Sequence, residues 1–442
     1  MLSSSTSRFP FIFRYSLLQI PNFLSFPSSS SLHSHSTRQV DEAVHSFTRM
    51  LSMRRPPSII QFTKILGSLA KTNHFSTAIS LFQQLQARGI APDLFTLSIV
   101  INCCCGIGRV TLAFSVLAKI FRMDYQPNTV TLTTILKGLC LCGSVEKAVR
   151  FHDRVLAHGF HFDQVTYGTL INGLCKTGHT SAAIQVLRKI PQYGIAPDVF
   201  MYSAIIDSLC KDTLVNKAKY IFNTMAQIRV LPNVQSYSIM INGFCKSKMV
   251  DEALNLFEEM RRKNLVPNTV TYSTLIDGLS KSKRISCALE LLVKMHERGQ
   301  PANVVTYNSL LDGMFNIKQV DKALMLFKQM KENGIDPDIC TYSVLIDGLC
   351  KGGRLVVAKE IFKDLSVKGY PPNVRTYTIM INGLCREGLF EEALALLSEM
   401  EHNGCLPNAV TFETVIRALF EKDENDMAEK LLREMVARGL LN

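Results

Sequence analysis

At 442 residues and 47% hydrophobic side chains the chain can bury a large core, and its 24 glycines and 16 prolines are too few for a disordered class. Lysine and arginine outnumber aspartate and glutamate by 49 to 37, and this net charge of +12 fits a polyanionic partner without requiring one. Length alone suggests about three globular domains, but internal repeats overrule that estimate.

The first forty residues differ from all that follow. Residues 1–40 contain twelve serines, no acidic residue, and three charged side chains, Arg8, Arg14 and Arg38. Such a composition is typical of an organellar transit peptide, and it suits the alternative, a secretory signal peptide, less well. We predict an unstructured leader over 1–40 that directs the chain to a mitochondrion, with the chloroplast as the alternative. Without the leader the charge is still +12 − 3 = +9. No segment reaches the roughly 18 apolar residues of a membrane helix, so no membrane span is expected.

The rest of the chain is periodic. After a partial repeat over 41–58, residues 59–408 form ten blocks of 35 residues without insertion or deletion, and an eleventh block, 409–442, is one residue short. The complete blocks begin at Ile59, Leu94, Thr129, Gln164, Val199, Val234, Thr269, Val304, Ile339 and Val374. We count repeat positions from these starts.

Three positions are nearly constant. Alanine fills the twentieth position of all eleven blocks, glycine the thirty-first of eight, and proline the thirty-fourth of eight of the ten complete blocks. The glycine suits a left-handed helix end, and Asp124 and Asn264 are its best substitutes. Arg229 fits this conformation poorly, so a looser turn is expected there.

Each block has the pattern of a helical hairpin. In the block that begins at Val374, apolar residues recur at helical spacing from Tyr377 to Leu384 and again from Phe390 to Met400, with Gly388 between them. A single hairpin cannot bury both of its apolar faces, so neighbouring hairpins must stack. The predicted fold is all-α: a right-handed superhelical α-solenoid of helix-turn-helix repeats, with a groove lined by the first helices.

Cysteines and other reactive residues give no catalytic or metal-binding pattern. Seven of the thirteen cysteines share the twelfth position, which predicts packing residues in a reducing compartment rather than disulfides or zinc ligands; they are Cys105, Cys140, Cys175, Cys210, Cys245, Cys350 and Cys385. The cluster Cys103–Cys105 and the pair Cys140 and Cys142 lack paired metal-ligand spacing. No catalytic residue, metal or cofactor is predicted, and the chain is not expected to be an enzyme.

Three segments carry a family resemblance. They are Val-Thr-Tyr-Ser-Thr-Leu-Ile-Asp-Gly-Leu at 270–279, Thr-Tyr-Ser-Val-Leu-Ile-Asp-Gly-Leu-Cys-Lys at 341–351 and Asp-Glu-Ala-Leu-Asn-Leu-Phe-Glu-Glu-Met at 251–260. Over residues 38–442 the chain resembles pentatricopeptide repeat proteins of the pure 35-residue class, in particular the plant organellar group that is similar to fertility restorers. Because the chain ends within its eleventh repeat, no editing or nuclease domain is expected. The resemblance therefore implies a monomeric binder of single-stranded RNA, with a recruited nuclease or other processing factor as a second partner.

The resemblance also implies how RNA would be read. In the family each repeat binds one base through its fifth and last positions. Carried over, the pairs are Thr63/Asp93, Ser98/Asn128, Thr133/Asp163, Gly168/Asp198, Ser203/Asn233, Ser238/Asn268, Ser273/Asn303, Asn308/Asp338, Ser343/Asn373 and Thr378/Asn408. The family's pairing of these residues with bases gives 5′-GAGxAAAUAA-3′, where Gly168 leaves the fourth base open and Glu413 leaves the eleventh repeat unread.

Two further positions are implied to contact RNA. The second position would wedge between bases, and its apolar members are Ile60, Phe95, Val130, Val165, Phe200, Val270, Val305 and Val410, whereas Gln235, Cys340 and Arg375 depart from this pattern. A cation at the thirteenth position would contact phosphate, or would only stabilise a helix C-terminus; these cations are Lys71, Lys176, Lys211, Lys246, Lys281, Lys351 and Arg386.

Alternative interpretations remain at this point. Aspartate or asparagine at the last position is also what helix N-capping alone would select. The fifth position is more informative, because serine, threonine or asparagine occupies nine of the ten complete repeats where better helix formers are available. The alternative function is a protein-binding scaffold of the tetratricopeptide kind, although that family repeats every 34 residues. An RNA-cleaving enzyme would need a carboxylate set that we do not find.

Overall fold

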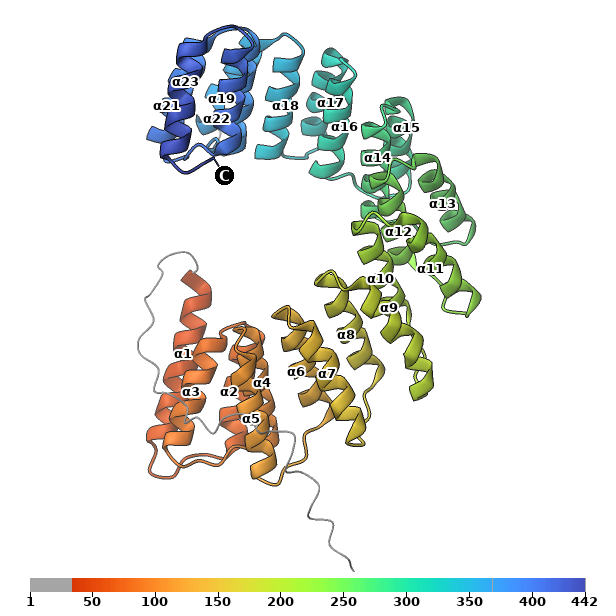
Figure 1. The fold of residues 1–442 in the computed structure, drawn as a ribbon, viewed down its shortest axis with the longest axis vertical. Helices are drawn as coiled ribbons and strands as arrows, with labels where there is room; N and C mark the ends of the chain where they lie inside the picture. The colour runs from red at the N-terminus through yellow and green to blue at the C-terminus, as the bar shows by residue number, and fades with distance from the viewer. Residues whose placement is uncertain (1–33, 368, 442) are drawn as a thin grey trace, which may run out of the picture. The chain divides into compact units, whose positions relative to one another are not determined.

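The computed structural model describes residues 34–367 and 369–441 as helices joined by short turns (Figure 1). Helix α1 (Ser34–Ser52) comes first. The first helices of the repeats are α2 (Ile59–Lys71), α4 (Leu94–Gly106), α6 (Thr129–Leu141), α8 (Gln164–Lys176), α10 (Val199–Lys211), α12 (Val234–Lys246), α14 (Thr269–Lys281), α16 (Val304–Asn316), α18 (Ile339–Lys351), α20 (Val374–Arg386) and α22 (Ala409–Phe420). The second helices are α3 (Phe75–Ala87), α5 (Val110–Arg122), α7 (Val145–Ala157), α9 (Thr180–Lys189), α11 (Val215–Gln227), α13 (Val250–Arg262), α15 (Ile285–Glu297), α17 (Val320–Glu332), α19 (Leu355–Val367), α21 (Phe390–His402) and α23 (Asn425–Ala437).

These helices confirm the predicted period, because each first helix begins at the predicted start of its block. The all-α prediction is confirmed as well, since the described residues contain helices and no strands. The predicted leader lies outside the described residues up to position 33. Residues 34–40, which we assigned to that leader, belong to α1. Helix α1 therefore crosses the boundary that the sequence predicts after residue 40.

The chain forms two compact units, Met1–Ser208 and Leu209–Asn442. In the first unit α2, α4, α6 and α8 contact one another in sequence, and in the second unit α12, α14, α16, α18, α20 and α22 do the same. Most second helices contact both the first helix of their own repeat and that of the next. Each unit is thus a row of first helices covered by a layer of second helices (Figure 1). Among the described residues, no helix is long and apolar enough to cross a membrane.

Alanine at the twentieth position allows this close packing. From Ala113 to Ala428 each of these alanines is fully buried, and Ala78 is 2% exposed. A ring contact recurs between repeats, from the twenty-fourth position to the fourth position of the next repeat: Phe222 meets Tyr237 at 5.1 Å between centroids and Phe257 meets Tyr272 at 5.4 Å, both edge to face. Such pairs add to the burial of the rings themselves. Side-chain packing between repeats therefore holds the row together.

The twelfth-position cysteines pack as the sequence predicts, and their contact is specific. The sulfurs of Cys105 and Cys245 lie against the tenth position of the next repeat, which is glycine. A Cβ added to Gly138 would lie only 2.4 Å from Cys105 Sγ, and one added to Gly278 only 2.5 Å from Cys245 Sγ. Residues at the tenth position of several repeats are glycine for this reason, a relation between repeats that we did not predict. At this level the space between successive first helices is too small for an added methyl group.

Burial makes these thiols unreactive. It raises the pKa of Cys105 and Cys245 to about 12 and that of Cys385 to about 11. Because the thiolate is the nucleophile, a brief iodoacetamide pulse on folded protein at pH 8 is expected to label exposed Cys142, Cys287 and Cys340 first. Peptide mass spectrometry would measure the order, with urea-unfolded protein as the control. Equal labelling of Cys105 and Cys142 in the folded protein would contradict the packing role.

Both turns of the hairpin end a helix in the same way. In the turn after α3, Gly89 N–H donates to Gln86 O at 2.9 Å and Ile90 N–H donates to Leu85 O at 3.3 Å, which is the Schellman arrangement. The looser turn expected at Arg229 is wrong. Arg229 has φ 63°, and the turn keeps the two equivalent hydrogen bonds, from Arg229 N–H to Ala226 O and from Val230 N–H to Met225 O. Packing on both sides imposes the left-handed conformation on a residue that does not prefer it.

The same conformation recurs at the fifteenth position, between the two helices of each hairpin, where Thr213 is the β-branched case at φ 61°. A left-handed residue with a Cβ costs about 1–2 kcal/mol, so Thr213→Gly is expected to raise the free energy of unfolding by about 1 kcal/mol. Urea denaturation followed by circular dichroism would measure it. The control is Thr224→Gly, inside α11, which should lower stability by about 0.3 kcal/mol. Destabilisation by both changes would contradict strain at Thr213.

The fourth repeat is irregular. Pro191 cannot donate a helical hydrogen bond, and the second helix continues after α9 as a 3-10 turn, Ile190–Tyr193 (η1). Next to it, His152 replaces the phenylalanine of the ring contact and lies 5.4 Å from Tyr167 between centroids. The buried His152 Nε2 and Tyr167 hydroxyl have no hydrogen-bond partner among the described residues.

Candidate nucleic-acid interface

The last position of each complete repeat is the N-cap of the next first helix. Asp93 Oδ1 accepts from Thr96 N–H at 2.8 Å, and Asn268 Oδ1 accepts from Thr271 N–H at 2.9 Å. The capping role that the sequence allowed is therefore present. It uses one side-chain atom only, however, and leaves Oδ2 of an aspartate or Nδ2 of an asparagine for another partner. The same N–H acceptance is found at Asn128, Asp163, Asp198, Asn233, Asn303, Asp338, Asn373 and Asn408.

These capping side chains are accessible. Asp163 and all six asparagines at the last position are exposed, and Asp93, Asp198 and Asp338 are half-buried. Burial by itself would raise the pKa of Asp338, but hydrogen bonds from Thr341 N–H, Thr341 O–H and Asn308 hold it below the usual value. This carboxylate is therefore ionised at neutral pH and can only accept hydrogen bonds.

The fifth position lies beside the last position of the same repeat, as the resemblance implies. The contact is made through a residue that the sequence did not single out, the third residue of the next repeat. Thr63 Oγ1 lies 2.7 Å from Thr96 Oγ1, which donates to Asp93 Oδ1 at 2.7 Å. The same chain of contacts joins Ser98, Thr131 and Asn128; Thr133, Thr166 and Asp163; Ser238, Thr271 and Asn268; Ser273, Thr306 and Asn303; Ser343, Thr376 and Asn373; and Thr378, Thr411 and Asn408.

Two repeats depart from this chain of hydroxyls. At the eighth, Asn308 Nδ2 donates directly to Asp338 Oδ1 at 3.4 Å, and no described residue forms a hydrogen bond with the buried Asn308 Oδ1. At the fourth, Gly168 has no side chain, and the Phe200 ring lies 3.4 Å from where its Cβ would be. The structure therefore joins the predicted pair directly in the eighth repeat and leaves it incomplete in the fourth.

Apolar side chains at the second position are exposed beside the caps. Exposure runs from 50% for Phe200 to 71% for Phe95. Between these values lie Ile60, Val130, Val165, Val270, Val305 and Val410. The three departures, Gln235, Cys340 and Arg375, are exposed too. Each repeat therefore presents an exposed second-position side chain, usually apolar, next to an exposed or half-buried polar cap. This set, repeated along each unit, is called the cap row below.

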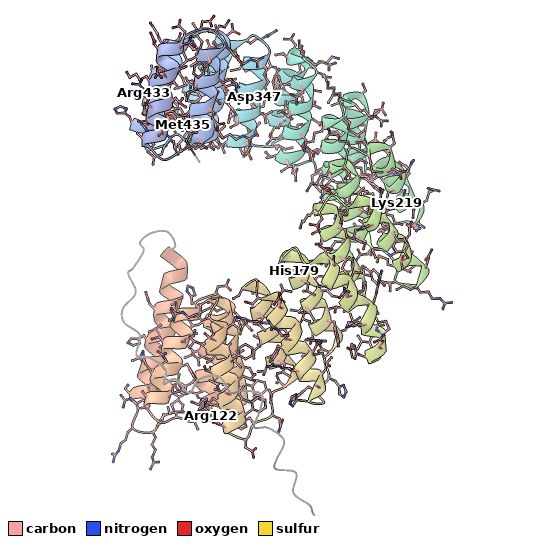
Figure 2. All side chains as sticks on the ribbon, in the orientation of Figure 1. Arg122, His179, Lys219, Asp347, Arg433 and Met435 are labelled. Atoms are coloured by element: carbon pink, nitrogen blue, oxygen red, sulfur yellow. The ribbon has the colours of Figure 1, made fainter. Side chains whose placement is uncertain are left out.

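The thirteenth-position cations are the last residues of their first helices. The cap row lies at the opposite end of the same helices, so the length of the exposed helix face separates the two. At 100° per residue, the second, ninth and thirteenth positions lie within about 40° of one another around a helix. Lys281 Nζ lies 2.6 Å from Asp277, and Lys351 Nζ lies 2.5 Å from Asp347, the ninth-position carboxylate on α18 (Figure 2). Lys71, Lys176, Lys246 and Arg386 form no ion pair with a described residue, and their ninth positions are Gly67, Asn172, Asn242 and Asn382.

Known proteins resemble this chain over most of its length. The model of the PPR repeat family matches residues 57–106, 127–176, 162–211, 197–246, 240–281, 267–316 and 302–351, and PPR repeat models match 340–370, 368–401 and 403–436. A putative mitochondrial pentatricopeptide repeat-containing protein of Arabidopsis thaliana is 48% identical over 67 residues, 15% of this chain and 13% of that protein. A second mitochondrial one is 34% identical over 107 residues, 21% of this chain and 17% of that protein. The matched segments thus span less than a fifth of either relative.

A solved structure supports the fold. The pentatricopeptide repeat protein PPR10 from maize aligns over 91% of this chain and 67% of its own, with a TM-score of 0.53 and 22% identity. This similarity shows the fold, whereas the repeat models, which cover most of the sequence, show the family. The chain belongs to the pentatricopeptide repeat family.

Proposed function

We propose that this protein binds one stretch of single-stranded RNA in a sequence-specific way, with one base for each complete repeat. The observation that carries the proposal is the cap row. Exposed apolar side chains recurring at one place in successive repeats mark a binding surface rather than ordinary surface variation. Polar atoms with fixed orientation beside them supply the selectivity that apolar wedges cannot.

The capping geometry supports a chemical rule for that selectivity. Asparagine keeps Oδ1 on the helix N–H and turns its Nδ2, a donor, outward, whereas ionised aspartate turns outward Oδ2, an acceptor. Adenine and cytosine carry an unprotonated ring nitrogen on the pairing edge, and guanine and uracil carry a ring N–H. Asparagine therefore suits adenine or cytosine, and aspartate suits guanine or uracil. This agrees with the target 5′-GAGxAAAUAA-3′ that the family's pairing gives.

Free cations supply the backbone contacts in this proposal. From the fifth to the thirteenth position a helix rises about 12 Å, a distance that one nucleotide and one lysine side chain together can span. Lys71, Lys176, Lys246 and Arg386 would contact phosphate, while the carboxylates of Asp277 and Asp347 already hold Lys281 and Lys351. Four contacts predict a slope of about −3 for the logarithm of the binding constant against that of salt concentration.

The cellular setting is part of the proposal. The names of the two Arabidopsis relatives include the word mitochondrial, and residues 1–40 have the composition of a transit peptide. We place the protein in mitochondria as a monomer, divided into a leader, a partial repeat over 41–58, ten repeats over 59–408 and a last repeat over 409–442. Bound RNA would be protected, remodelled or presented to a recruited nuclease, with consequences for transcript processing, stability or translation. Grouping with fertility restorers belongs to the same proposal.

The test is binding of the full chain to the ten-nucleotide RNA, read by fluorescence anisotropy at two salt concentrations. Scrambled RNA of equal composition and a single-stranded DNA of equal sequence are the controls. Preference for the target, with the salt slope given above, supports the proposal. Equal, weak binding to every RNA would refute base reading and bring forward the protein-binding scaffold of the tetratricopeptide kind.

A further inference from the structure

The third residue of each first helix is a buried hydroxyl at most repeats. Thr96, Thr131, Thr166, Thr271, Thr306, Thr341, Thr376 and Thr411 are fully buried, as is Ser236 at the same position. A buried hydroxyl must find its partners within the protein. In seven described cases these partners are the cap of its own helix and the fifth-position hydroxyl of the preceding repeat.

Hydrogen atoms in this cluster are limited. Ser238 Oγ lies 2.8 Å from Val234 O and 2.7 Å from Thr271 Oγ1, and Thr271 Oγ1 lies 3.0 Å from Asn268 Oδ1. Two hydroxyl hydrogens serve these three contacts, because Val234 O and Asn268 Oδ1 carry none. When both hydrogens point to protein oxygens, Ser238 Oγ can offer only a lone pair to a ligand.

The same threonine restricts the cap. Asn268 Oδ1 accepts from Thr271 N–H at 2.9 Å and from Thr271 O–H at 3.0 Å. Reversing the amide would place its NH2 group against these two donors. Two hydrogen bonds thus hold Nδ2 outward where one would let the side chain swing. One threonine therefore determines which hydrogen-bonding group, donor or acceptor, the fifth-position side chain and the cap of the preceding repeat offer to a ligand.

The fourth repeat provides a natural comparison. Its fifth position is Gly168, and the third position that follows is Met201 instead of threonine or serine. Met201 is fully buried, and its Cε lies 4.0 Å from where a Cβ of Gly168 would be, so it fills the space of the missing hydroxyls. Asp198 keeps only the backbone cap from Met201 N–H, at 2.9 Å. Both hydroxyls of the cluster are absent from the same repeat.

The eighth repeat provides a second comparison. Its fifth position is Asn308, which reaches Asp338 directly. Thr341 still donates N–H and O–H to Asp338 Oδ1, both at 2.8 Å, but its oxygen accepts from Asp338 N–H at 3.2 Å instead of contacting the fifth position. Thr341 is therefore as buried and as good a cap partner as Thr271, without the link to the preceding repeat.

We propose that the third-position threonine is a positioning residue that determines base selectivity for the repeat before it. This role rests on the base-reading function proposed above. The recognition site for one base is then built from two repeats and three residues: the fifth position and the cap, which face the base, and a buried hydroxyl that orients both.

The test compares variants of the full chain by their binding to RNAs that differ at nucleotide six, which Ser238 and Asn268 face. Thr271→Val removes the hydroxyl at nearly constant volume and should reduce the preference for A over G about tenfold, the effect of one or two hydrogen bonds. Thr271→Ser should keep the preference within about twofold. The matched control, Thr341→Val, should lower the melting temperature similarly but keep the preference for U over A at nucleotide eight within about twofold. Its cap, Asp338, presents an acceptor whichever carboxylate oxygen points outward, so loss of the Thr341 O–H does not change what the base meets.

Outcomes separate this role from the function on which it rests. Unchanged selectivity in Thr271→Val, or an equal loss of affinity for all four bases at nucleotide six, would overturn the positioning role while base reading stands. Wild-type protein that has no preference at any nucleotide would overturn both.

A gain-of-function variant tests the same idea without weakening a helix cap. Gly168→Ser together with Met201→Thr restores both hydroxyls beside Asp198 and is expected to create a preference for G at nucleotide four of about fivefold or more. Gly168→Ser alone leaves the new hydroxyl against Met201 and should create less than about twofold preference. Equal preferences from the single and double variants would refute the role of the threonine.

Discussion

Asn268→Asp is expected to reverse the preference of the sixth repeat from A to G. The cap keeps one oxygen on Thr271 N–H in either case, so the substitution converts the outward group from a donor to an acceptor. One well-placed hydrogen-bonding pair is worth about 1–3 kcal/mol, so the ratio of affinities for the two RNAs should change by about tenfold to a hundredfold in each direction. Anisotropy titration with RNAs that carry A or G at nucleotide six would measure the ratio.

Comparing ratios removes two side effects of this substitution. The added negative charge weakens binding to every RNA alike, and aspartate and asparagine are nearly equal as N-caps, so the melting temperature should hold. The reciprocal control is Asp163→Asn, which should change nucleotide three from G to A while nucleotide six keeps its preference. A sixth repeat that still selects A after Asn268→Asp would rule out the orientation argument.

Gly348→Ala is expected to be the most damaging of the small substitutions. A Cβ at this position of α18 would lie 2.1 Å from Phe315 Cγ and 2.4 Å from the two neighbouring ring carbons. Alanine favours a helix by about 1 kcal/mol over glycine, but overpacking of this kind costs about 1–3 kcal/mol and forces two first helices apart. We expect a net loss in the free energy of unfolding, measured by urea denaturation.

The structure offers a matched control. Gly67 lies inside α2, and its added Cβ would meet only Ile99 Cδ1 at 3.5 Å, an ordinary contact. Gly67→Ala should therefore raise stability by about 0.5–1 kcal/mol. The double variant Gly348→Ala with Phe315→Ala should lose less stability than the sum of the two single losses, because the ring that clashes is gone. If Gly348→Ala behaves like Gly67→Ala, the close approach is not a constraint.

The period and the hairpins were predictable because they depend on local patterns. Ala78 and its equivalents, the apolar spacing from Tyr377 to Leu384, and the caps after each proline are all visible within one repeat. Contacts between repeats were harder to predict. The pairing of Cys105 with Gly138 links residues 33 positions apart, and nothing in either segment alone shows that a methyl group has no room between them.

Some errors have an identifiable physical cause. Arg229 was expected to loosen its turn because intrinsic preference disfavours φ 63° there, but the stacked helices on both sides determine the turn. Thr96 and its equivalents are visible in the sequence at regular spacing, yet they read as ordinary helix residues. Their contacts beneath the cap row depend on burial and on a hydroxyl from another repeat. Pro191 is visible in the sequence, and its missing N–H is a local reason for the 3-10 turn.

The contacts that join one repeat to the next fix which changes of length this chain tolerates. The hydroxyl contacts and the cysteine–glycine contacts both connect residue i to residue i + 33. Deleting or inserting a single codon between the partners would break every such contact across that junction at once. In-frame duplication of 35 residues keeps every contact between repeats, wherever its breakpoints fall. The copied segment contains one residue from each position of the repeat, so both partners of each contact are present at the new junction. Unequal recombination can therefore lengthen or shorten the array by whole repeats, and the 350 residues without an insertion or deletion are the expected record of that process.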